Sequence, residues 1–305
     1  MTICSAKVIA SSISSLVASI YTLQLRYPGW IHPEVMTHRD FSRNAASWRA
    51  IPIEKVLAAI AANMAIPMHW GLNEKGMQAK RRLTEKSEIA AAVALWKEAG
   101  RKAMSTARDL HDLLDLHKQV VNRLLQPFCH YDTIVTATSW NNFFALRCHP
   151  ATEPHMRLLS WRVAEAIKAA KPTLLQEGEW HLPYVTAEEK TTLPLDVQKA
   201  CSTARCARVS YLLHDGTKTD PVKDQDLVTK LLAGLGKDDN EPGHMSPFEH
   251  QATPLKDATA RSGNFVGWLQ HRKTIPGEVM GFDYEAAVAR GWREDAFAIE
   301  PSSSD

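Results

Sequence analysis

The sequence predicts an α/β protein in which long helices pack against a mixed β-sheet. β-branched and aromatic residues gather over 6–10, 16–26 and 133–138, as they do in strands. Apolar residues recur at helical spacing from Thr84 to Pro127 and again from Glu153 to Pro172. Together these two patterns place the chain in the α/β (α+β) class.

The first strands are followed by short helical segments. The Tyr27-Pro28-Gly29 sequence predicts a turn that ends the strand at 16–26. Residues 31–37 are predicted to form a short helix that delivers His38 and Arg39 from its end. Pro52 fits the first turn of the next helix. The apolar face of that helix consists of Val56, Leu57, Ile60 and Met64.

The longest helical region is expected between Thr84 and Pro127. Thr84 has the chemistry of an N-cap, and carboxylates in the following turn suit the positive end of the helix dipole. Gly100 is a candidate break that would divide the region into two helices. A second amphipathic helix opens at Glu153-Pro154, with a proline at its first turn and Pro172 as its stop.

The remaining sequence predicts one catalytic domain over residues 1–300, made of two halves at 1–170 and 201–280. The proline-containing stretch 171–200 is interpreted as a surface linker between them. Another helix is expected around 227–232. The tail at 301–305 has no apolar residue and is expected to be disordered.

Composition narrows the class of protein. The 305 residues are 45% hydrophobic and 23% charged, with a net charge of +2, so nothing favours a nucleic-acid-binding or membrane-surface protein. Five cysteines without a C-x-x-C pair indicate reduced thiols. Lys7 interrupts the first apolar run, and residues 8–25 fall short of a membrane span, so we expect a cytoplasmic protein. No H-E-x-x-H or tight Cys/His cluster predicts a metal.

The most informative segment is Thr37–Arg49, which reads T-H-R-D-F-S-R-N-A-A-S-W-R. Its cations cannot be buried without partners, and Asp40 is the only carboxylate within the run. The run therefore predicts a cradle for an external polyanion, most simply a phosphate. A solvated basic loop is the alternative reading.

The spacing H-R-x-x-S-x-N-x-x-S-x-R from His38 to Arg49 resembles the signature of the flavin-dependent thymidylate synthases. A second segment at 243–250 resembles the H-x-S-P-F-E-H segment of that family. Here the second segment, and an A-R-V-S-Y-like segment at 207–211, follow Arg147 instead of preceding the first motif. This order looks like a circular permutation, an arrangement that some phage-encoded relatives share. The resemblance therefore points to a viral source, in which case the cytoplasm is that of the host.

The resemblance implies a largely antiparallel sheet with long helices and a homotetramer with active sites between subunits. It implies reductive methylation of the nucleotide dUMP to dTMP, with FAD as cofactor and with NADPH and methylenetetrahydrofolate as co-substrates. No nucleic acid and no membrane is expected as a partner. A site built of arginines, serines and histidines fits this division of labour, because the cofactor performs the difficult chemistry.

The resemblance also assigns roles to individual residues. Ser47, Arg49 and Arg123 match residues that hold the nucleotide phosphate. Arg147 matches the arginine that recognises the pyrimidine and would stabilise negative charge on it, so it is both a substrate-binding and a catalytic candidate. The cofactor-binding candidates are His38, Arg39, Asn44 and His250, of which His250 would lie against both flavin and nucleotide and is also a catalytic candidate.

Three positions depart from the family pattern. Thr37 replaces an arginine, Ala45 a glutamate, and Glu34 a glutamine of the substrate shell. A carboxylate at Glu34 would accept a hydrogen bond from an exocyclic amine, which leaves open a methylase or hydroxymethylase that acts on dCMP as well as dUMP. A second alternative is an inactive nucleotide-binding relative. Cys148, beside Arg147, is an alternative candidate for a covalent nucleophile.

Overall fold

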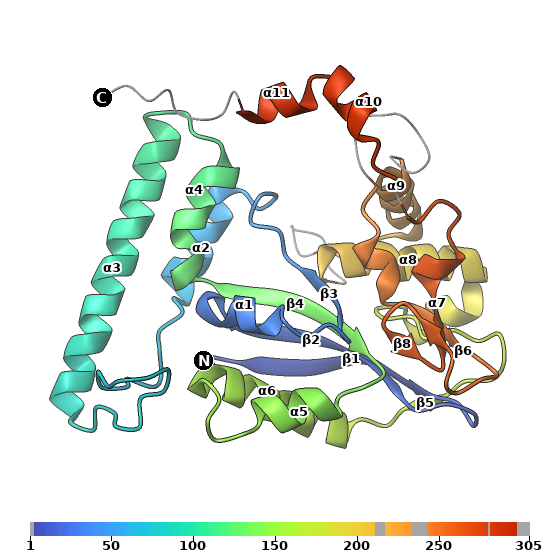
Figure 1. Cartoon of the computed structure of the whole chain (residues 1–305), viewed down its shortest axis with the longest axis horizontal. Coiled ribbons are helices and arrows are strands. Elements are labelled where there is room, and N and C mark those ends of the chain that lie inside the picture. Colours follow the sequence, from blue (N-terminus) through green and yellow to red (C-terminus); the bar gives the residue numbers. More distant parts are fainter. Residues whose placement is uncertain (1–2, 211–216, 234–242, 280, 298–305) are drawn as a thin grey trace.

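The computed structural model describes residues 3–210, 217–233, 243–279 and 281–297. Its centre is a five-stranded sheet with the strand order β3-β4-β2-β1-β5 (Figure 1). All neighbouring strands are antiparallel except the short β1–β5 pair. The predicted α/β class with a largely antiparallel sheet is therefore confirmed. The strands are β1 Ser5–Ile13, β2 Ile20–Pro28, β3 Ser42–Ala45, β4 His130–Ala137 and β5 Thr173–Leu174.

Helices pack on both faces of the sheet, and a small β region lies between α9 and α10 in the chain. The segment resembling H-x-S-P-F-E-H forms a 3₁₀ helix, η3. None of the described helices combines the length and the apolar character needed to cross a membrane. The elements are α1 His32–Val35, α2 Ile53–Ala62, α3 Lys86–Asp112, α4 Lys118–Leu125, α5 Asn141–Arg147, α6 Pro154–Ala169, α7 Ala187–Thr192, α8 Leu195–Arg208, α9 Pro221–Leu232, η3 Ser246–Glu249, β6 Ala252–Pro254, β7 Arg261–Ser262, β8 Phe265–Val266, β9 Trp268–Gln270, α10 Tyr284–Ala289 and α11 Trp292–Phe297.

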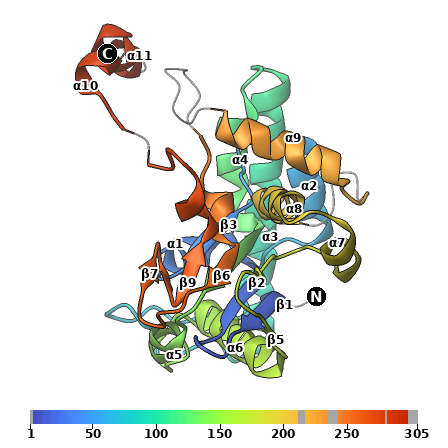
Figure 2. The same cartoon turned by 90° about the vertical axis from the view of Figure 1, so that its right-hand side faces the viewer.

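Side-chain alternation along β2 and β4 gives the sheet two different faces. One face carries Leu23, Leu25 and Val135, which pack against α5 and α6 in the main core. The opposite face carries Ile134, which packs against α8. Figures 1 and 2 show α6 and α8 on opposite sides of the sheet. The sheet is thus buried on both sides.

The predicted long helix is present, but Gly100 does not break it. Helix α3 runs without interruption from Lys86 to Asp112, and its N-cap is Glu85, not Thr84. Gly100 is buried, and a Cβ there would lie 2.5 Å from the Met64 Cε atom and 3.1 Å from Phe128 Cδ1. The glycine therefore allows a close helix contact. The chain turns farther on, between α3 and α4.

The stretch 171–200 does more than link two halves along the surface. It contributes β5, all of α7 and the start of α8. His181 and Leu182 within it are buried, and His181 forms a backbone bridge with Ala252. The stretch is therefore part of the packed structure. The single-domain boundary 1–300 stays a prediction, and the tail at 301–305 lies outside the described residues.

Candidate functional site

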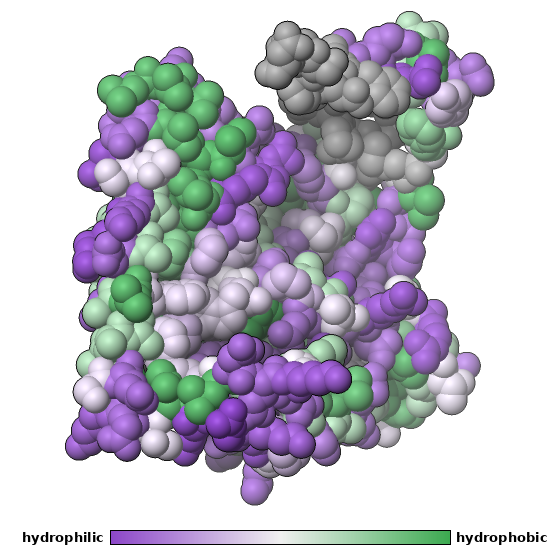
Figure 3. Space-filling view, turned by 60° about the vertical axis from the view of Figure 1, so that its left-hand side comes forward, coloured by the Kyte–Doolittle hydropathy of each residue, from purple (hydrophilic) through white to green (hydrophobic). Residues whose placement is uncertain are grey.

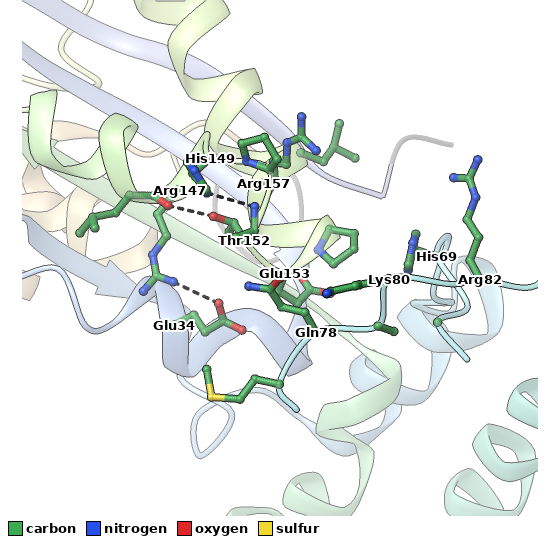
Figure 4. A pocket seen from close by; sticks show the side chains of 18 of the residues that line it. Glu34, His69, Gln78, Lys80, Arg82, Arg147, His149, Thr152, Glu153 and Arg157 are labelled. Carbon is green, nitrogen blue, oxygen red and sulfur yellow. Dashed lines mark hydrogen bonds and ion pairs between the residues drawn. The ribbon is translucent and has the colours of Figure 1, made fainter. Parts of the chain in front are cut away.

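The guanidinium of Arg147, at the end of α5, brings together side chains from the end of α1. Its Nε donates to His38 Nε2 at 3.0 Å, and one Nη donates to Thr37 Oγ1 at 3.1 Å. The other Nη lies 3.4 Å from Glu34 Oε2 (Figure 4). Residues more than a hundred positions apart thus form one polar cluster, which includes two of the three positions that depart from the family pattern.

The protonation of this cluster follows from its contacts. Burial, together with Arg147 and Arg43, lowers the pKa of His38 to about 4, so the imidazole is neutral at pH 7 and accepts from Arg147. Burial and the nearby Glu153 raise the pKa of Glu34, although Arg147 opposes the shift. A carboxyl group with a raised pKa retains its proton more readily, and in that form it can donate a hydrogen bond as a glutamine would.

An open cleft of about 1410 Å³ adjoins the cluster. One wall is the turn between α5 and α6, and the other is the loop 69–82, as Figure 4 shows. Both carboxylates in the cleft already have partners, because Glu34 contacts Arg147 and Glu153 contacts His155. Within the described part of the chain, no ion pair engages the lining cations Lys80, Arg82 and Arg157. The balance of charge therefore favours an anionic ligand.

A buried histidine, His155, ties the start of α6 to the residue that precedes the loop 69–82. The carboxylate of Glu153 caps α6 by accepting from the backbone N–H groups of His155 and Met156 at 2.7 and 2.8 Å. It also lies 2.5 Å from His155 Nδ1. His155 Nε2 accepts from the backbone N–H of Met68 at 3.0 Å. Because a backbone amide can only donate, the imidazole proton is on Nδ1 and points to Glu153.

Sequence reasoning gave no functional role to the cations of the loop 69–82, to Arg157 or to His155. Lys80 and Arg82 lie in a stretch with neither helical nor strand periodicity, and Arg157 is one of many polar residues on an amphipathic helix. Only the Glu153-Pro154 start of α6 carried a local signal. These cations become a site because the fold brings the loop to α6.

Two of the proposed cofactor residues line a smaller hollow of about 290 Å³. His38 and Arg39 lie on one side of it, and Asn142 and Phe143 of α5 lie on the other. Leu146 lines both this hollow and the larger cleft. The two residues fit a cofactor-binding role, because a cationic donor and a neutral imidazole face accessible space.

The two segments that resemble the family motifs, 38–49 and 243–250, contact each other at β3. Ser246 Oγ donates to Asn44 Oδ1 at 2.7 Å, and Asn44 Nδ2 donates to the Cys206 carbonyl at 3.2 Å. His250 is fully buried, with its Nδ1 2.8 Å from Thr136 Oγ1. Burial lowers the pKa of His250 to about 3. Neither Asn44 nor His250 is among the described residues that line the cleft or the hollow, and their cofactor-binding role stays a prediction.

The proposed phosphate residues form a separate basic surface. Asn122 Nδ2 donates to the carbonyls of Trp48 and Ile51 at 2.8 and 2.9 Å, which ties the turn carrying Ser47 and Arg49 to α4. Both of these side chains are exposed, as is Arg123 on α4. Of the predicted substrate residues, only Glu34 and Arg147 are among the described residues that line the cleft.

Comparisons with known proteins add similar structures but no similar sequences. No protein-family model matches the sequence, and no curated protein matches it. Among solved structures, the chain is similar to a UMP/dUMP methylase, PolB, from Streptomyces cacaoi bound with 5-Br dUMP. The TM-score is 0.46 and the identity 14%, over 55% of this chain and 90% of that chain. The same methylase bound with 5-Br UMP gives a TM-score of 0.46 and 15% identity, over 55% of this chain and 89% of that chain.

Proposed function

We propose that this protein is a flavin-dependent pyrimidine nucleotide methylase that converts dUMP to dTMP. Methylenetetrahydrofolate would supply the carbon and NADPH the reducing equivalents. The observation that carries the proposal is the contact of Arg147 with Glu34, Thr37 and His38 at the edge of a cationic cleft. These residues lie in or beside the segments whose sequences resemble those of the flavin-dependent thymidylate synthases.

The residues of the cluster would bind and orient the base. The Arg147 guanidinium is oriented by its three contacts, so it can donate to a pyrimidine carbonyl and stabilise negative charge that develops on the ring. Lys80, Arg82 and Arg157 give the cleft the charge that a nucleotide phosphate requires. His38 and Arg39 would hold FAD. The flavin supplies the hydride and carries the methylene group when it is bound.

A neighbouring subunit would complete the site. The predicted substrate residues fall into a cleft group, Glu34 and Arg147, and a turn group, Ser47, Arg49 and Arg123, that does not line the cleft. A homotetramer with sites between subunits would bring the two groups together. Figure 3 shows hydrophobic side chains gathered over one end of the long-helix face. Four apolar residues of α4 and of the connection between α3 and α4 are between 42% and 77% exposed: Leu113, Leu114, Val120 and Leu124.

The chemistry of Glu34 favours a second candidate, a methylase or hydroxymethylase of dCMP. In its ionised form Glu34 would accept from the 4-amino group of cytosine, and in its protonated form it would donate to the 4-oxygen of uracil. Its raised pKa brings the two forms closer together in free energy. The choice of base therefore depends on the protonation of one carboxyl group.

Product analysis distinguishes these candidates. The purified protein is incubated with FAD, NADPH, labelled methylenetetrahydrofolate and either dUMP or dCMP, and the product mass is measured. A gain of a methyl group on dUMP is expected. A labelled cytosine or hydroxymethyl product would support the second candidate. Nucleotide binding without any product would support an inactive nucleotide-binding relative and overturn both.

Arg147→Ala tests the carrying observation directly. We expect it to weaken dUMP binding by about 1.5–3 kcal/mol, roughly a 10- to 150-fold rise in Kd, because it removes hydrogen bonds from a charged donor. Isothermal titration calorimetry measures this change. Arg162→Ala is the matched control, since that arginine on α6 pairs only with Glu165 in the described structure and is 46% exposed. Equal affinity in both variants would refute the role of Arg147.

A further inference from the structure

Five buried side chains form a continuous hydrogen-bonded chain across the sheet face that α8 covers. Ser12 Oγ lies 2.9 Å from His181 Nδ1, and His181 Nε2 lies 2.8 Å from Thr22 Oγ1. Thr22 Oγ1 lies 2.7 Å from Thr136 Oγ1, which lies 2.8 Å from His250 Nδ1. Each of the five residues is at most 4% exposed. Water therefore does not compete for these contacts.

The sheet holds this chain in place. Thr22 and Thr136 are directly opposed in the register of β2 and β4, so their hydroxyl groups lie on the same face. His181 is fixed by two backbone hydrogen bonds with Ala252, at 2.7 and 3.3 Å. Since Ala252 follows His250 by only two residues, the same bridge restrains both histidines. The five hydrogen-bonded side chains are thus part of the rigid core.

The direction of these hydrogen bonds follows from the environment of His250, at one end of the five hydrogen-bonded side chains. His250 Nε2 is buried and has no partner among the described residues. A buried N–H without an acceptor is rarer than an under-satisfied acceptor, so the proton of His250 belongs on Nδ1. Burial lowers the pKa of both histidines to about 3, so each carries a single ring proton.

With that starting point, each hydroxyl proton has one available acceptor along the chain. His250 Nδ1–H donates to Thr136, whose hydroxyl donates to Thr22. The Thr22 hydroxyl donates to His181 Nε2, and His181 Nδ1–H donates to Ser12. Both histidines are then Nδ1–H tautomers. Neutral imidazoles in water favour the Nε2–H form, so this assignment is distinctive.

We propose that Ser12, His181, Thr22 and Thr136 act as one hydrogen-bond relay that fixes His250 as the Nδ1–H tautomer and leaves its Nε2 nitrogen as a hydrogen-bond acceptor. Ser12 lines a hollow of about 390 Å³ beside β1 and β5, together with Lys171 and Lys190. Four hydrogen bonds therefore connect the enclosed imidazole of His250 to a serine that borders accessible space.

The four residues of the relay are positioning residues for His250.

Nitrogen NMR of the full chain tests the relay. The protein is labelled with ¹⁵N-histidine, and long-range ¹H–¹⁵N correlations are recorded at neutral pH. The expected result is the Nδ1–H form at both His181 and His250. An Nε2–H or doubly protonated form at His250 would overturn the proposal.

A substitution far from His250 gives the decisive NMR measurement. Ser12→Ala removes the acceptor of His181 Nδ1–H, which favours the reversed hydrogen-bond direction. The His250 signal should then move toward the Nε2–H form, although Ser12 does not touch His250. Ser11→Ala is the control, because Ser11 Oγ donates to the Lys171 carbonyl at 3.4 Å, outside the relay.

A second break covers the case in which Ser12→Ala does not fold. Thr22→Val keeps the shape of the side chain and removes the hydroxyl group from the middle of the chain. The tautomer signals of His181 and His250 should both change. An unchanged His250 signal in a folded variant of either kind would refute a connected relay.

Discussion

A buried arginine on α8 gives the sharpest test of how the structure is held together. Arg205 is fully buried. Its guanidinium donates to the two carboxylate oxygens of Glu189 at 2.7 and 2.6 Å and to Asp224 at 2.9 Å. It also donates to Thr219 Oγ1 at 3.1 Å and to the Tyr184 carbonyl at 2.8 Å. One side chain therefore ties α7 and α9 to α8.

Arg205→Ala should lower the free energy of unfolding by about 3–5 kcal/mol, the usual cost of removing one partner from a buried ion pair. Asp224 is fully buried and keeps only Arg208 as an ion-pair partner in the described structure. Glu189, whose side chain is 16% exposed, loses both of its contacts with Arg205. The matched surface change, Lys102→Ala, breaks a pair that is 76% and 49% exposed. It should cost no more than about 1 kcal/mol.

Urea unfolding at pH 7, followed by circular dichroism, measures both changes. Arg205→Lys keeps the charge but loses the planar fork, so its loss should be intermediate. A loss below about 1 kcal/mol for Arg205→Ala, equal to that of the Lys102 control, would refute the reasoning.

The ion pair between Arg205 and Glu189 also predicts how the free energy of unfolding depends on pH. Burial alone would raise the pKa of Glu189, but hydrogen bonds from Arg205 and Thr186 hold the pKa below its ordinary value of 4.5. A carboxyl group whose pKa is lowered by folding stabilises the protein above its unfolded pKa and loses that contribution as the pH falls through its folded pKa. The difference in stability between wild type and Arg205→Ala should therefore shrink below pH 4.5.

Three further predictions concern the candidate site. Arg123→Ala should weaken nucleotide binding by about 1.5–3 kcal/mol in calorimetry, and unchanged affinity would mean that its role was misassigned. Cys148→Ser should leave turnover largely intact, because burial raises the pKa of the Cys148 thiol and disfavours the thiolate; loss of activity would revive covalent catalysis. Glu153→Gln should cost about 1–2 kcal/mol of stability and speed tryptic cleavage at Lys80 to Arg82. An unchanged cleavage rate would show that the loop is held by other contacts.

Elements with a strong local pattern could be predicted from the sequence. The amphipathic pattern of α6 and its Glu153 cap depend on neighbouring residues, and the structure has both. Gly100 was misread because a glycine weakens a helix locally, whereas its advantage here comes from Met64 and Phe128, which are distant in sequence. The role of 171–200 was missed for the same reason, since β5 is defined by its pairing with β1.

Only part of the candidate site was predictable from the sequence, namely the residues of the polar cluster around Arg147. The motif spacing singled out His38, and the family resemblance singled out Arg147; the structure puts the two side chains in contact. The burial of His250 and the bonding of Asn44 depend on how η3 packs on β3, which no local pattern encodes. The lining cations of the loop 69–82 carried no signal because they have no periodicity.

The contact between β3 and the C-terminal part of the chain has a consequence for biosynthesis. A ribosome that has completed Asn44 must add 202 residues before Ser246 exists, and 228 residues separate Ser42 from Gln270. Until then Ser42 and Asn44 of the edge strand β3 lack the side-chain partners Gln270 and Ser246, and an edge strand left uncovered invites wrong pairing between nascent chains. The segment with the most conspicuous chemistry is therefore among the first to be translated and among the last to be secured.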